Sequence, residues 1–87
     1  MRALSVDLAP RGIRANHLNL GYFKAPMTSK SFNNFKLREK REKRTLLSRW
    51  GEVDEFIGPT VFLLSAASSY ITGSGIDVDG GWLAKGL

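Results

Sequence analysis

The 87 residues suffice for one domain at most, and 43% hydrophobic with 24% charged side chains is the composition of a globular protein rather than a disordered one. The absence of cysteine and the single histidine, His17, exclude a disulfide framework, a thiolate metal site and a histidine cluster, so we expect no metal. The N-terminus lacks a signal peptide's apolar run and no stretch could span a bilayer, so we expect a cytoplasmic protein without a membrane partner.

The first half of the chain is predicted to begin with the end of a helix, residues 1–9, which stops at Pro10 and Gly12. A buried strand is predicted over 13–20, followed by a loop that reaches Pro26. One or two helices follow within 28–47, with Thr28 or Ser29 as candidate N-caps. Their expected apolar anchors are Phe32, Phe35, Leu46 and Leu47.

The second half begins with a predicted turn at Trp50 and Gly51. Helical spacing of apolar residues predicts a helix over 53–65, which Pro59 should kink or shorten. Alternating apolar residues then predict a strand over 75–79 that is closed by two glycines. Strand, helices and strand in this order indicate a parallel crossover within an α/β sheet. Because two short strands make a poor parallel sheet, the chain is expected to be incomplete as a domain.

The net charge of +5 is concentrated in one segment of the chain. This segment could bind phosphates or another anionic partner, but a solvated helical face explains it better. No aromatic residue interrupts the segment to stack on bases, so nucleic-acid binding is only a weaker alternative. We call this segment the basic run, and its cations are Lys36, Arg38, Lys40, Arg41, Lys43, Arg44 and Arg49, with Glu39 and Glu42 between them.

Several short motifs follow one another along the chain: 8–16 (LAPRGIRAN), 21–23 (GYF), 26–27 (PM), 49–51 (RWG), 67–73 (ASSYITG) and 78–82 (VDGGW). In this order they resemble the C-terminal third of the classical short-chain dehydrogenases/reductases. Their ending is similar to that of members acting on sugar acids, such as gluconate 5-dehydrogenases.

The resemblance implies a doubly wound Rossmann sheet that binds NAD or NADP at the carboxyl ends of its strands. Residues 13–20 would be the sixth strand and 75–79 the seventh, at the sheet edge. Residues 28–48 would form the substrate lid. The 53–65 helix and the edge strand would take part in subunit interfaces, so a homo-oligomer is expected.

The resemblance also implies a partial cofactor site in the loop after the sixth strand, which lines the nicotinamide end in the family. The chain departs from the family where Leu20 replaces a proline and Ala25 replaces a threonine whose hydroxyl would bind the cofactor. From the residues alone, Gly21 is equally well explained as a turn residue. The candidate cofactor-binding residues are Leu20, Gly21, Tyr22, Phe23 and Ala25.

No catalytic residue is assigned. No G-x-G-x-x-G motif occurs, and neither Tyr22 nor Tyr70 has the lysine four residues later that the family's acid/base tyrosine requires. We expect both tyrosines to be packing residues. If the chain continued upstream, the family's spacing would put that tyrosine and lysine roughly eleven and seven codons before Met1, about one helical turn apart.

Two functions remain open at this stage. The chain is either the C-terminal segment of an NAD(P)-dependent oxidoreductase, inactive alone, or a non-catalytic docking or regulatory chain that associates with intact relatives. Four further residues are interpreted as structural: Asn16 as a polar pin beside the strand, Trp50 as lid packing, Trp82 as a cap over the last strand, and His17.

Overall fold

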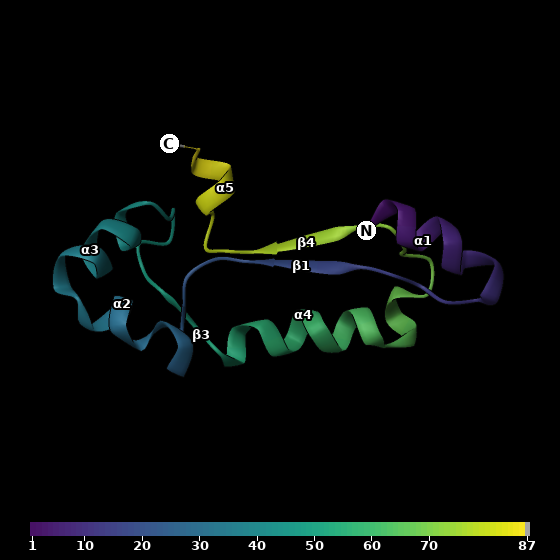
Figure 1. The fold of residues 1–87 in the computed structure, drawn as a ribbon, viewed down its shortest axis with the longest axis horizontal. Helices are drawn as coiled ribbons and strands as arrows, with labels where there is room; N and C mark the ends of the chain where they lie inside the picture. The colour runs from purple at the N-terminus through teal and green to yellow at the C-terminus, as the bar shows by residue number, and fades with distance from the viewer. Residues whose placement is uncertain (87) are drawn as a thin grey trace.

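The computed structural model describes residues 1–86, which form an elongated molecule of 49 × 25 × 19 Å around a central pair of strands (Figure 1). Short 3-10 turns lie at Ala9–Arg11, Pro26–Thr28 and Ala66–Ser68. The helices and strands are α1 (Arg2–Leu8), β1 (His17–Leu20), β2 (Phe23–Lys24), α2 (Ser29–Asn33), α3 (Phe35–Lys43), β3 (Gly51–Glu52), α4 (Asp54–Leu64), β4 (Gly75–Val78) and α5 (Trp82–Lys85).

The predicted parallel crossover is confirmed, because β1 and β4 pair in parallel with His17 opposite Gly75 and Leu20 opposite Val78. The first strand is shorter than the predicted 13–20. Its expected beginning lies beside a loop instead of a strand: the Ala15 N–H donates to the Thr72 hydroxyl (3.1 Å) and the Ala15 carbonyl accepts from Gly73 N–H (2.8 Å). The backbone groups of this segment are therefore satisfied without extending the ladder.

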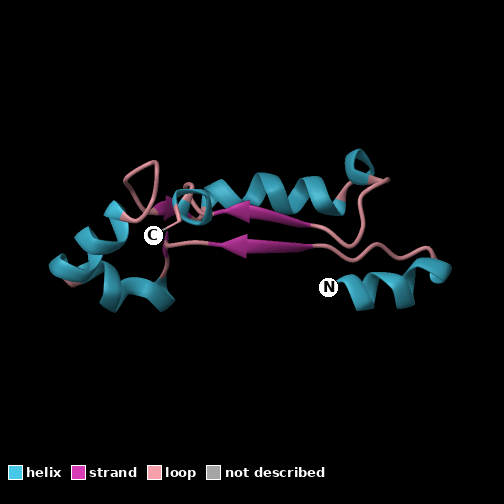
Figure 2. Cartoon of the chain, turned by 90° about the horizontal axis from the view of Figure 1, so that it is seen from above, coloured by secondary structure: helices cyan, strands magenta, loops and turns pink. Residues whose placement is uncertain are grey.

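Helix α4 runs along one side of the strand pair, and α1 lies near the N-terminal ends of the strands, on the other side from α4 in Figure 2 (Figures 1 and 2). After α1, the predicted stop is confirmed: Pro10 lies in the short 3-10 turn Ala9–Arg11, and Gly12 follows with φ of 72°, a left-handed conformation that glycine adopts without strain. Helix α4 runs unbroken through Pro59, which therefore does not divide it. Mixed helices and parallel strands confirm the α/β class.

The segment 28–47 contains two helices that Asn34 separates. The Asn34 side chain accepts from Leu37 N–H (3.2 Å) and so caps α3, which was not predicted. Thr28 precedes α2 but does not cap it with its side chain, because its hydroxyl donates back to the Phe23 carbonyl (2.5 Å). Thr28 thus fixes the preceding loop instead of the helix.

The apolar core is small and lies beside these helices. Its largest member is Trp50, which is only 2% exposed, and the only other buried apolar residues in 1–86 are Ala15 and Phe23. Of the predicted anchors, Phe32 packs edge-on against Trp50 with ring centroids 5.3 Å apart. The prediction is wrong for Phe35, Leu46 and Leu47, which are exposed: Phe35 begins α3 on a side that no further layer covers, and Leu46 and Leu47 lie in the turn after α3.

A second two-stranded ladder ties the region together. The predicted turn at Trp50–Gly51 leads into β3, and β3 pairs in parallel with β2, with Phe23 opposite Gly51. This ladder was not predicted because two residues per strand carry no periodicity. It holds the segment after the basic helices α2 and α3 against the loop that follows β1.

Much of the apolar surface remains open. Ile57, Val61 and Leu64 of α4 are exposed, as are Leu4 and Val6 of α1. Among residues 1–86, no helix has the length and hydropathy needed to cross a bilayer. The same residues contain no cluster of three or more His, Cys, Asp or Glu side chains suited to a metal ion.

Candidate functional site

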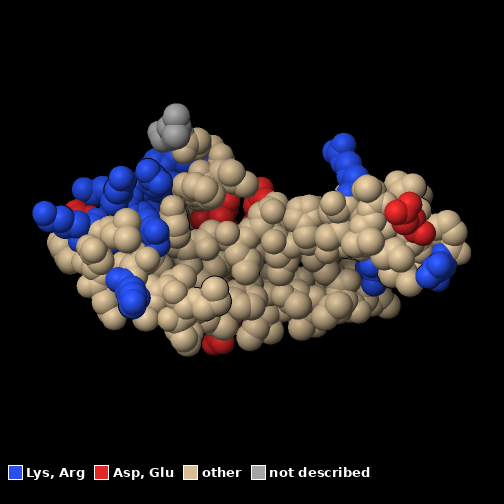
Figure 3. Space-filling model, viewed as in Figure 1, with Lys and Arg blue, Asp and Glu red and all other residues tan. Residues whose placement is uncertain are grey.

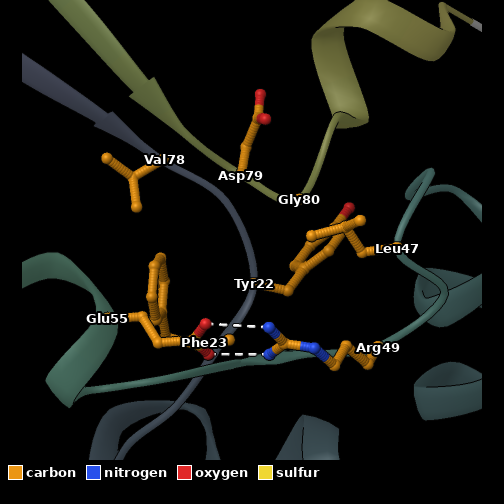
Figure 4. Close-up of a pocket in the computed structure, with 9 residues that line it drawn as sticks. Tyr22, Phe23, Leu47, Arg49, Glu55, Val78, Asp79 and Gly80 are labelled. Atoms are coloured by element: carbon orange, nitrogen blue, oxygen red, sulfur yellow. Dashed lines mark hydrogen bonds and ion pairs between the residues drawn. The ribbon is translucent and has the colours of Figure 1, made fainter.

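The candidate site lies where β1 and β4 end and the loop 21–25 begins. Figure 4 shows the small hollow at this point, with a volume of about 50 Å³. This is far below the roughly 300–1,000 Å³ of a complete small-molecule pocket, so the hollow by itself is too small to enclose such a ligand. Its lining residues are Tyr22, Phe23, Leu47, Arg49, Gly51, Glu55, Val78, Asp79 and Gly80.

Gly21 stands at the crossing point of the two strand ends. Its N–H donates to the Val78 carbonyl at 3.0 Å, and a β-carbon at this position would lie 2.8 Å from both Cα and Cβ of Asp79. Only glycine fits so close to a neighbouring backbone. Sequence reasoning left Gly21 open between a turn and a cofactor contact. The structure adds a third reason for glycine, which is the close passage of two chain segments.

Tyr22 is at the centre of an aromatic cluster. Its ring lies 5.6 Å from that of Trp50 and 5.8 Å from that of Trp82, and the Arg41 guanidinium lies 4.8 Å from the Tyr22 centroid. Its carbonyl accepts from Gly51 N–H at 2.8 Å. The packing interpretation of Tyr22 and Trp50 is confirmed. Trp82, expected as a cap over the last strand, begins α5 directly after β4 and joins this cluster.

The remaining predicted site residues flank Tyr22. Leu20 ends β1 and is half exposed, whereas Phe23 is buried and packs edge-on against Phe56 at 5.3 Å. At Ala25, where the family has threonine, the backbone N–H donates to the Thr28 hydroxyl (3.0 Å). The structure therefore places Leu20, Gly21, Tyr22 and Phe23 in one continuous turn at the strand ends, with Ala25 just beyond. Their role toward a cofactor stays a prediction.

An ion pair that sequence reasoning missed closes one side of the hollow (Figure 4). Arg49 donates through both terminal nitrogens to the carboxylate of Glu55 at 2.7 and 2.8 Å, and Glu55 also accepts from Glu52 N–H at 2.9 Å. These bonds link β3 to the first turn of α4. Arg49 had been grouped with the basic run, and only the turn between β3 and α4 brings it to Glu55.

These hydrogen bonds hold the pKa of Glu55 at about 2, below its ordinary 4.5, chiefly through Arg49 and then through the Glu52 N–H. The Glu55 carboxylate in turn raises the pKa of Arg49 through the same hydrogen bonds. A carboxyl whose folded pKa is depressed stabilises the fold above its unfolded pKa and loses that contribution as pH falls through the folded pKa. For Glu55 this window runs from about pH 4.5 down to about pH 2.

We therefore expect the Glu55 side-chain carboxyl carbon to titrate near pH 2 in an NMR experiment, with the Glu52 amide proton shift following it. In an Arg49→Ala variant the midpoint should rise toward the ordinary value, because the largest cause of the shift is removed. A midpoint near 4.5 in the unmodified chain would show that the ion pair does not form in solution.

Asn16, just before β1, has the structural role expected of it, whereas the interpretation of His17 stays a prediction and that of Tyr70 is wrong. The Asn16 amide donates to the Ile71 carbonyl (2.9 Å) while its oxygen accepts from Ser74 N–H (3.0 Å), as expected of a polar pin. The His17 ring packs against Gly75, where a β-carbon would overlap it, and its Nδ1 is buried without a partner among residues 1–86. Tyr70, expected to pack, is fully exposed, because it lies in a turn outside the layers.

The sequence and the fold both match known dehydrogenases. A family model described as enoyl-(acyl carrier protein) reductase matches residues 1–83. Gluconate 5-dehydrogenase of Gluconobacter oxydans is 38% identical over 80 residues, which are 92% of this chain and 31% of that protein. The 5-keto-D-gluconate 5-reductase of Escherichia coli K12 is 40% identical over 82 residues, 94% of this chain and 32% of the relative.

Among solved structures, a gluconate 5-dehydrogenase from Burkholderia cenocepacia in complex with NADP and tartrate superimposes with a TM-score of 0.91 at 37% identity, covering 95% of this chain and 32% of that one. A short chain dehydrogenase family protein from Francisella tularensis gives a TM-score of 0.82 at 30% identity, covering 95% of this chain and 38% of that one. The chain thus spans about a third of the length of the relatives it matches. On the family match over residues 1–83 and the shared Rossmann-type α/β fold, the chain belongs to the short-chain dehydrogenase/reductase family.

Proposed function

We propose that this chain is the C-terminal segment of an NAD(P)-dependent oxidoreductase that transfers hydride between nicotinamide and an alcohol or ketone, with a sugar acid such as gluconate as substrate. The observation that carries the proposal is the turn from Leu20 to Phe23 at the carboxyl ends of β1 and β4, the place where parallel α/β sheets bind their ligands. The C-terminal placement is supported by the order of the motifs in the sequence.

In this proposal the chain supplies one wall of the nicotinamide site and the substrate lid. Close packing on Asp79 fixes the backbone at Gly21, so the loop can present its peptide groups to the carboxamide without rearranging. Nicotinamide, when bound, donates or accepts the hydride. The proton transfer needs a tyrosine with a lysine four residues later, and residues 1–87 contain no such pair, so the chain alone is proposed to be inactive.

The proposal is tested by a chimera in which this chain replaces the matching third of the Burkholderia cenocepacia gluconate 5-dehydrogenase. We expect the chimera to oxidise gluconate with an NADP or NAD cofactor. A matched Gly21→Val chimera should lose most of this activity, because the larger side chain meets Asp79. The isolated chain should show no micromolar binding, equivalent to about 8 kcal/mol, when Trp50 and Trp82 fluorescence is titrated with NADH or NADPH. A folded chimera without activity on gluconate would contradict the sugar-acid proposal.

A second candidate function is that of a docking or regulatory chain that associates with intact relatives. The exposed apolar side chains of α4 and the unpaired strand edges of a two-stranded sheet favour it, because such surfaces associate readily. The helix α4 and the strand β4 are the proposed contact elements, also in a homo-oligomer. Analytical sedimentation of the isolated chain tests this second function. Self-association supports contacts through these surfaces, whereas a monodisperse monomer argues against them.

A further inference from the structure

The Lys and Arg side chains gather at the end of the molecule that carries α2 and α3, whereas the face formed by the strands and α4 is mostly uncharged (Figure 3). Seven candidate cations lie in the basic run. Three of them are paired with carboxylates: Arg38 with Glu42 (3.2 Å), Lys43 with Glu39 (3.2 Å) and Arg49 with Glu55 (2.7 Å). The other four, Lys36, Lys40, Arg41 and Arg44, have no carboxylate within 4.0 Å among residues 1–86.

Arg41 differs from the other unpaired cations in its surroundings. It is half-buried, whereas Lys36, Lys40 and Arg44 are exposed. Its guanidinium carbon lies 4.8 Å from the Tyr22 ring centroid and 5.8 Å from that of Trp50. A cation–π contact of this kind uses the charge of a guanidinium but not its five N–H donors. No hydrogen bond from these donors to another group is found within the described part of the chain.

The place of Arg41 connects it to the candidate site. Tyr22, on which it stacks, belongs to the loop after β1 and lines the hollow at the strand ends. Asp79, the carboxylate that lines the same hollow, accepts from Gly81 N–H at 2.9 Å and from Leu83 N–H at 3.2 Å. A guanidinium held in one direction by two rings loses little conformational freedom when it binds, and its fork of donors matches a carboxylate.

We infer that Arg41 is the residue that recognises the carboxylate of the sugar-acid substrate. For the nature of this substrate the inference rests on the proposed function. It goes beyond that function by selecting one specificity-determining cation out of the seven that the sequence offers. It also assigns Tyr22 a second role, because the ring that packs against Trp50 also orients the guanidinium.

The test is a titration of the full 87-residue chain with gluconate, followed by NMR of the Arg41 side-chain N–H and the Trp50 indole N–H. Sorbitol, with a similar carbon chain and no charge, and sodium chloride at matched ionic strength are the reference solutes. We expect saturable shifts with gluconate alone. The dissociation constant should rise about tenfold in Arg41→Met, equivalent to about 1.4 kcal/mol, less in Arg41→Lys, and not at all in the matched control Arg44→Met.

Two results would overturn the inference. One is a loss in Arg44→Met as large as in Arg41→Met, and the other is a response to sodium chloride equal to that to gluconate, since either shows diffuse charge only. The Lys variant, which keeps the charge, guards against a packing defect in the Met variant. The titration uses no nicotinamide and no turnover. If the chimera is active but the chain does not bind gluconate, the role of Arg41 is contradicted and the proposed function is not. If the chain binds gluconate but the chimera is inactive, the proposed function is contradicted and the role of Arg41 is not.

Discussion

Replacing Trp50 by alanine is expected to remove most of the packing between the basic helices and the loop after β1. Trp50 is the largest fully buried side chain among residues 1–86, and its ring contacts both Phe32 and Tyr22. Its indole N–H also donates to the Arg38 carbonyl at 3.3 Å. Truncations of this size in a core cost about 3–5 kcal/mol. In an 87-residue chain with so few buried apolar residues, such a loss should disorder this end of the molecule.

The measurement is urea unfolding followed by Trp82 fluorescence, together with hydrogen exchange at the Gly51 amide, whose N–H bonds the Tyr22 carbonyl. Phe35→Ala is the matched control, because this aromatic ring lies on α3 but is 73% exposed, and its loss should change stability by less than about 0.5 kcal/mol. Equal effects of the two substitutions would show that Trp50 does not form the core of this region.

Replacing Arg14 by alanine is expected to destabilise the segment 65–74, which connects α4 to β4. One terminal nitrogen of Arg14 donates to the Ser68 carbonyl (2.7 Å), to the Ser68 hydroxyl (2.7 Å) and to the Leu63 carbonyl (3.2 Å), and the other donates to the Ser65 carbonyl (3.2 Å). The Leu63 carbonyl lies in the last turn of α4, and the Ser65 and Ser68 carbonyls follow it and also accept from the Ser68 and Ile71 amides. A hydrogen bond to a charged group contributes about 1.5–3 kcal/mol, but the acceptors keep other donors, so we expect a total loss of only about 2–4 kcal/mol.

Hydrogen exchange at the Ile71 amide, which bonds the Ser68 carbonyl, reports on this connection directly. Arg14→Lys should recover only part of the protection, because an ammonium cannot reach the acceptors on both sides of the guanidinium. Arg11→Ala is the control, since Arg11 is exposed. If Arg11→Ala and Arg14→Ala accelerate exchange equally, the bonds of Arg14 do not hold the loop in place.

The regular elements followed from local patterns. Alternation over residues 75–79 predicted a strand, helical spacing over 53–65 predicted α4, and their order predicted the parallel pairing of β1 with β4. The predictions failed where they depended on which residues pack against a side chain in space, because a local sequence pattern does not contain this information. Phe35 and Tyr70 are aromatic and were expected to be buried, yet no layer lies over them. Thr28 precedes a helix as a cap would, yet its hydroxyl bonds the loop behind it.

The sequence by itself determined the element order, the α/β class and the family motifs, because periodicity and turn residues act over a few neighbouring positions. The pairs Arg38–Glu42 and Glu39–Lys43 are four positions apart on one helix, but only the tertiary structure decided the partners of the other arginines. Arg14 reaches carbonyls about fifty positions away, Arg49 finds Glu55 across a turn, and Arg41 stacks on Tyr22 without a carboxylate. These contacts form because distant segments of the chain meet in the folded structure. The spacing of residues along the sequence does not predict which segments meet.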